Sequence, residues 1–175
     1  MKQVKYLVMT ALCVALGVVL PVTLHAIPNA GSILLPMHIP VLLCGLVCGP
    51  VYGLACGILA PLLSSLITSM PPMAMLPRMI CELAVYGLVA GILIRVIKTR
   101  YNIANLYLSL LGALLIGRVI YGSRNSLSFR AGEYSLQLWR TGAFVTALPG
   151  IAIQLVLLPV LVLALQKARL VEATV

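Results

Sequence analysis

The sequence predicts an all-α integral membrane protein, folded as one bundle of six transmembrane helices. Of its 175 residues, 62% are hydrophobic and only 9% are charged, whereas a soluble domain carries about 25% charged residues. Apolar stretches long enough to cross a hydrocarbon core of about 30 Å recur along the chain. We expect spans at about residues 6–24, 37–48, 51–69, 77–96, 104–122 or longer, and 143–165, in a single domain of residues 1–175.

The first span stays apolar from Tyr6 to Leu24, which is long for the core of a signal peptide. Within it, Ala11 and Ala15 lie four residues apart and therefore share one helix face. Small residues at this spacing let another helix approach closely. On physical grounds alone, packing within this chain is the simpler explanation of the pair.

The second and third spans are predicted to form a tight helical hairpin. Four glycines, at positions 45, 49, 53 and 57, repeat every four residues, and Gly49-Pro50 makes the turn. Because glycine has no side chain, two helices can approach closely at these positions. The five cysteines all lie inside predicted spans, where buried thiols usually pack as small hydrophobic groups. We therefore expect neither a metal site nor a disulfide.

The fourth span begins at Pro77, a residue that suits the first turn of a helix. Arg78, Glu82 and Tyr86 follow at a spacing of four, so they share one face. Arg78 is close enough to the membrane surface to extend to the headgroups, whereas Glu82 is too deep. A carboxylate at that depth is paired, protonated or placed in a polar cavity, which makes this face a candidate site.

The fifth span is apolar at first and then turns amphipathic, because Arg118, Tyr121 and Asn125 fall on one face at helical spacing. Its end is not fixed by the sequence, since residues 122–141 either continue the helix or form a long loop. Trp139 in that segment suits a membrane interface. Two prolines in the sixth span predict a kinked helix.

Basic residues predict the orientation of the bundle. Six spans place both termini on one side, together with seven basic residues: Lys2, Lys5, Arg95, Lys98, Arg100, Lys167 and Arg169. The other side holds Arg124, Arg130 and Arg140. This asymmetry predicts cytoplasmic termini in a multi-pass protein of the plasma membrane. The net charge of +9 is thus explained by topology and anionic lipid, and no nucleic-acid partner is expected.

The chain resembles the substrate-binding S component of energy-coupling factor (ECF) transporters over essentially its whole length. The resemblance lies in the length, the six spans, the AxxxA pattern of Ala11 to Ala15, and three runs: PMHIPVLLCGLVCGPVYGLACGILAPLLSSL, PRMICELAVYGLVAG and GAFVTALPGIAIQLVLLPVL. One departure is the polar run YGSRNSLSFRAGEYS, where the family's fifth span is expected to stay mostly apolar.

The resemblance implies a subunit that binds a vitamin or related micronutrient tightly from the outer side. It implies docking, through Ala11 and Ala15, on a transmembrane coupling protein that carries two cytoplasmic ATPases, and delivery of the ligand by toppling in the membrane. The chain contains no Walker motif. ATP hydrolysis is therefore left to the partners, and we expect neither a cofactor nor an enzymatic activity in this chain.

The candidate ligand site combines charged and aromatic side chains. Arginine can hold an anionic group with two hydrogen bonds, a carboxylate can accept two from the edge of a heterocycle, and aromatic rings can stack on a flat ligand. These groups favour a flat, polar heterocycle, such as a vitamin or a modified-base precursor. The candidate residues are His38, Arg78, Glu82, Tyr86, Arg118, Tyr121, Asn125 and Trp139.

Three alternatives remain beside this interpretation. Arg78 or Arg118 can form a structural bridge to Glu82, which is compatible with a ligand site. A stand-alone secondary transporter is the second functional hypothesis, although no inverted repeat is visible. An intramembrane enzyme is a weaker one, because the chain has no Asp and no GxSxG motif.

Overall fold

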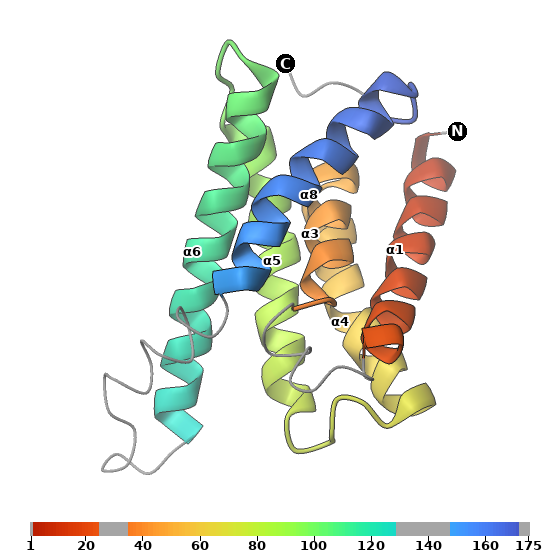
Figure 1. Ribbon diagram of the computed structural model, residues 1–175, viewed down its shortest axis with the longest axis vertical. Coiled ribbons are helices and arrows are strands. Elements are labelled where there is room, and N and C mark those ends of the chain that lie inside the picture. Colours follow the sequence, from red (N-terminus) through yellow and green to blue (C-terminus); the bar gives the residue numbers. More distant parts are fainter. Residues whose placement is uncertain (1, 25–34, 129–147, 172–175) are drawn as a thin grey trace.

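The computed structural model describes residues 2–24, 35–128 and 148–171, and these residues form six α-helices and no strand (Figure 1). The helices are α1 (Lys2–Leu24), α3 (His38–Cys48), α4 (Pro50–Thr68), α5 (Leu76–Val96), α6 (Asn102–Ser128) and α8 (Leu148–Lys167). Five of them are long and apolar enough to cross a membrane, and α3 is shorter. The prediction of an all-α bundle is therefore confirmed.

Helix α5 makes the most extensive contacts of the described helices, with α3, α4 and α6. Helices α3 and α4 form a hairpin at Gly49, whose φ of 100° requires the left-handed freedom of glycine. Helix α5 packs against both arms of this hairpin, α1 covers the other side of α3 and α4, and α6 and α8 complete the bundle. Figure 1 shows α1 beginning and α8 ending at one end of the bundle, which we call the termini end.

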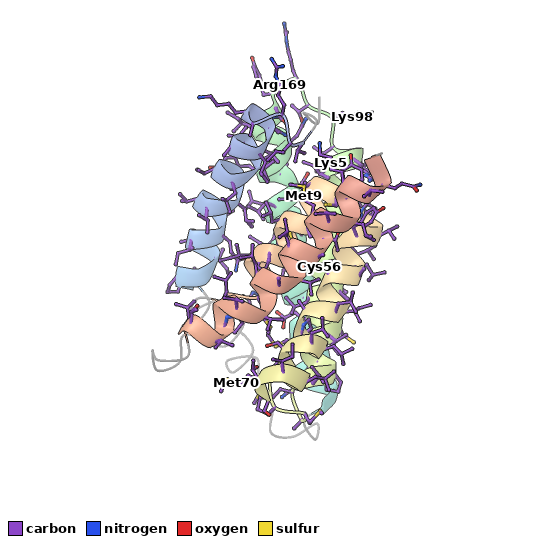
Figure 2. All side chains as sticks on the ribbon, turned by 90° about the vertical axis from the view of Figure 1, so that its right-hand side faces the viewer. Lys5, Met9, Cys56, Met70, Lys98 and Arg169 are labelled. Atoms are coloured by element: carbon purple, nitrogen blue, oxygen red, sulfur yellow. The ribbon has the colours of Figure 1, made fainter. Side chains whose placement is uncertain are left out.

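Figure 2 shows Lys5, Lys98 and Arg169 at the termini end and Met70 at the opposite end. We call the opposite end the Met70 end. The clustering of basic side chains is the feature on which the predicted orientation depends. Which end faces the cytoplasm stays a prediction.

Glycines bring the backbones of three helices into direct contact. A Cβ atom on Gly45 or on Gly53 would meet the carbonyl oxygen of Gly87, and a Cβ on Gly87 would meet the backbone of Gly53. A Cβ on Gly53 would also lie 2.7 Å from the Cα of Gly45. The glycine repeat thus serves the α3–α4 hairpin and, in addition, the contact of that hairpin with α5.

Burial distinguishes central from peripheral helices. Within the most apolar 18-residue stretch of each helix, 44% of the residues are buried in α5 and in α6, but only 22% in α1. Helix α1 thus presents most of its surface outward, with large apolar side chains such as Leu7 and Leu12 exposed. In a membrane these side chains face lipid or a partner protein.

The five cysteines are free thiols, four of them buried. Cys13, Cys44, Cys48 and Cys56 belong to one core cluster between α1, α3 and α4. The Cys44 thiol lies 3.4 Å from the carbonyl oxygen of Tyr52. These thiols therefore contribute to packing between helices.

Candidate functional site

Three charged or ionisable side chains from three helices meet inside the bundle. His38 Nε2 on α3 lies 3.3 Å from Glu82 Oε1 on α5, and Arg118 Nη1 on α6 lies 4.0 Å from the same oxygen. We call His38, Glu82 and Arg118 the ion group. The residues are 3%, 8% and 3% exposed, so all three are removed from lipid and from bulk water.

The helix faces explain how the ion group forms. Glu82 and Tyr86 lie on the inward face of α5, because four residues make just over one helical turn. His38 begins α3 and is buried there. Arg118 follows Gly117, both of them buried. Each helix thus aims one polar side chain at the same interior point.

Tyr86 is enclosed beside the ion group. Its ring packs edge-on against the ring of His38, with centroids 5.0 Å apart and an interplanar angle of 70°. A Cβ on Gly117 would meet the Tyr86 ring, so the backbone of α6 lies directly against it. Because Tyr86 is 0% exposed, the ring supports His38 in this structure.

The ion group places opposite charges next to each other. The Glu82 carboxylate lies next to a guanidinium that is permanently charged, and their attraction is stronger in the interior than in water. The Arg118–Glu82 separation of 4.0 Å is longer than a charge-assisted hydrogen bond of about 2.8 Å. The arrangement therefore holds a positive and a negative group side by side inside the bundle.

Sequence comparison identifies the family. The family model described as "ECF transporter, substrate-specific component" matches residues 5–162. The chain belongs to this family. No curated protein and no solved structure matches the chain. The resemblance seen in the sequence is thereby confirmed, and the protein is a membrane-embedded, substrate-specific subunit of the ECF transporter type.

The other predicted site residues of this S component are only partly placed. Arg78, one turn before Glu82 on α5, is half-buried. Tyr121 and Asn125 lie in α6, which continues to Ser128, but their side chains lie outside the described part. Trp139 falls between residues 129 and 147, which are not described either.

Ala11 and Ala15 of the S component lie on the exposed side of α1. The neighbouring residues Cys13 and Gly17 are buried instead, and a Cβ on Gly17 would lie 2.8 Å from the Cβ of Ala60 on α4. Helix α1 therefore packs on the bundle with a different face. Among the described helices, none covers the two alanines.

Sequence reasoning missed two features of the interior. The sequence predicts His38 as a ligand contact but not its position beside Glu82, whose Oε1 lies 3.3 Å from His38 Nε2. Gln154 on α8 is 0% exposed and is not among the residues that the sequence predicts for the site. A glutamine inside an otherwise apolar span is the signal that identifies it, because polar residues at membrane depth are costly.

Proposed function

We propose that this S component binds a water-soluble vitamin or related micronutrient with a flat, polar ring. It delivers this ligand by association with a transmembrane coupling protein and two ATPases in the plasma membrane. The observation that carries the proposal is the buried ion group. Charged side chains are rare and costly at membrane depth and usually mark a substrate pathway or site.

The chemistry of the ion group favours a ligand with two kinds of polar edge. The guanidinium of Arg118 binds an anionic or carbonyl oxygen, while the carboxylate of Glu82 accepts hydrogen bonds from an N–H edge. His38 adds a group that donates or accepts according to its tautomer. A heterocycle with both edges satisfies all three, and Arg78, Tyr86, Tyr121, Asn125 and Trp139 are the further contacts we propose.

A structural bridge between α5 and α6 is compatible with this role. Arg118 and Glu82 partly neutralise each other while the site is empty, which lowers the cost of burying both charges. A ligand that offers complementary groups then replaces one set of interactions by another. The proposal thus assigns the ion group both a structural and a recognition role.

The exposed face of α1 supports the proposed partner. Ala11 and Ala15 are exposed and uncovered by the described helices, and small residues four apart permit close approach of a second protein's helix. We propose that this face contacts the coupling protein. In this arrangement the basic termini end faces the cytoplasm, where the ATPases bind.

The test combines ligand identification with substitutions in the ion group. The chain is purified in detergent, and co-purified small molecules are identified by mass spectrometry. Glu82→Gln and Arg118→Ala are expected to weaken binding of the identified compound by at least about tenfold, as expected for a lost hydrogen bond to a charged group. The control is Lys98→Gln at the exposed termini end, which should leave affinity unchanged.

Two results would contradict the proposal. Unchanged affinity in both ion-group variants would show that the ligand binds elsewhere. Uptake into vesicles by the purified chain alone, driven by a proton or sodium gradient, would favour the secondary transporter instead.

A further inference from the structure

Gln154 on α8 carries a second recognition element. We propose that its side-chain amide binds a donor–acceptor edge of the ligand, such as a carboxamide, a lactam or an aminopyrimidine. This inference rests on the proposed function, because it names the class of ligand that the same interior binds. It concerns a neutral edge and adds to the charged contacts offered by the ion group.

The amide of Gln154 is buried and has no partner. The residue is 0% exposed, and within the described part of the chain neither Nε2 nor Oε1 makes a hydrogen bond. A buried amide that lacks hydrogen bonds is costly, and most buried polar side-chain atoms in proteins have a partner. A group that satisfies this amide offers an acceptor to Nε2 and a donor to Oε1.

A structural role within α8 does not account for this amide. Pro159 has no N–H, so it cannot bond the carbonyl four residues earlier, and polar side chains often compensate for such a gap in membrane helices. Gln154 is the nearest polar side chain in the sequence of α8. Its amide nevertheless makes no bond to any described group.

The position of Gln154 connects it to the ion group. Gly150, Gln154, Leu158 and Val162 are buried at a spacing of four, which defines the inward face of α8. Leu158 belongs to the same core cluster as Tyr86, and Tyr86 packs on His38. The amide therefore lies on the side of α8 that faces the cluster next to the ion group.

Helix register gives the relative depth. Asn102 Nδ2 donates to Gln166 Oε1 at 2.6 Å, which ties the start of α6 to the end of α8. At about 1.5 Å per residue, Gln154 lies about 18 Å from this contact and Arg118 about 24 Å. Figure 1 shows α8 inclined to α6, so the depth of Gln154 below this contact is less than its distance along the helix. Gln154 therefore lies at least about one turn closer to the termini end than Arg118.

A second buried atom supports the inference. Nδ1 of His38 is also buried and has no hydrogen-bond partner among the described residues, while Nε2 of the same ring faces Glu82. Helix α3, which carries His38, packs directly against α8. Two buried polar groups without described partners thus lie on helices that pack against each other, and a polar ligand that satisfies both would offset the cost of burying them.

The experiment compares Gln154→Leu with Gln154→Glu and uses a defined probe. Purified protein is equilibrated with a protein-free extract of rich growth medium. The extract is supplemented with nicotinamide, riboflavin and thiamine, which carry a donor–acceptor edge, and with nicotinate, which carries none because its carboxylate and ring nitrogen only accept hydrogen bonds. Retained compounds are quantified by mass spectrometry. Thermal unfolding of the ligand-free proteins is measured in parallel.

We expect ligand retention and the stability of the ligand-free protein to change in opposite directions. Gln154→Leu should reduce retention of the bound compound at least about tenfold and raise the unfolding temperature of the ligand-free protein, because an unsatisfied amide is removed. Gln154→Glu keeps an acceptor and should lose less than Gln154→Leu for a ligand that donates. The matched control on the same helix is Gln166→Leu, which should keep retention and lower the unfolding temperature by losing its bond to Asn102.

The outcomes separate the two proposals. Equal retention by the wild-type protein and Gln154→Leu would overturn the inference while leaving the proposed function intact. A lower ligand-free unfolding temperature in Gln154→Leu would also overturn it, because the amide would then have a partner within the protein. If the wild-type protein retains no compound from the probe, the proposed function fails and the inference fails with it.

Discussion

Replacing Glu82 with glutamine tests whether the ion group stabilises the bundle through charge. Glutamine keeps the size of the side chain and an oxygen that can accept a hydrogen bond from His38 Nε2, so the change removes little besides the charge. At 4.0 Å, two unit charges attract by about 4 kcal/mol at an effective dielectric constant of about 20. Removing one partner of a buried pair typically costs about 3–5 kcal/mol. We therefore expect Glu82→Gln to lower the free energy of unfolding by about 3 kcal/mol.

The assay is chemical unfolding of the ligand-free protein in mixed micelles, followed by circular dichroism. The double variant Glu82→Gln/Arg118→Met removes both charges and should recover much of the loss, because no uncompensated charge stays buried. Lys98→Gln, on an exposed residue, is the control and should have no effect. A loss below about 1 kcal/mol, typical of a solvent-screened pair, or additive effects in the double variant, would refute the argument.

Two further predictions concern packing and assembly. Gly87→Ala should strongly reduce the yield of folded protein, because its Cβ would meet the backbone of a neighbouring helix. Gly112→Ala is the control and should be tolerated, because its Cβ would meet only the flexible end of the Leu93 side chain, at 2.6 Å. The yield of both variants is measured by size-exclusion chromatography in detergent. Ala15→Trp should abolish ATP-dependent uptake with the coupling protein while leaving ligand retention by the isolated chain unchanged, and Val156→Trp on the exposed surface of α8 should affect neither.

The helices were largely predictable from the sequence, because apolar runs and their glycine and proline boundaries are local signals. The four-residue glycine repeat likewise predicted close helix packing. That Gly87 on α5 meets Gly45 and Gly53 was not predictable from this repeat, since it depends on which helices become neighbours. Local patterns define helix faces, whereas partners across the bundle are set by tertiary structure.

The candidate site also combines features that follow from local sequence with contacts that depend on the tertiary structure. The shared face of Arg78, Glu82 and Tyr86 follows from their spacing. The contact of Glu82 with His38 joins residues 44 positions apart, and no periodicity links them. The sequence predicts only a kinked helix around Gln154, because prolines lie five residues to either side of it. Its burial and the absence of a described partner, on which the proposed recognition role rests, are visible only in the folded structure.

The packing of the bundle bears on how tightly the proposed site can bind. The glycine contacts fix α3 and α5 backbone to backbone, and these helices carry His38 and Glu82. The contact of Gly117 with the Tyr86 ring fixes α6, which carries Arg118. The polar groups are therefore held in place before a ligand arrives, so little conformational freedom is lost on binding. A preorganised interior of this kind is the physical condition for the tight binding that we propose, and the glycine contacts make separation of α3 from α5 an unfavourable route for ligand entry.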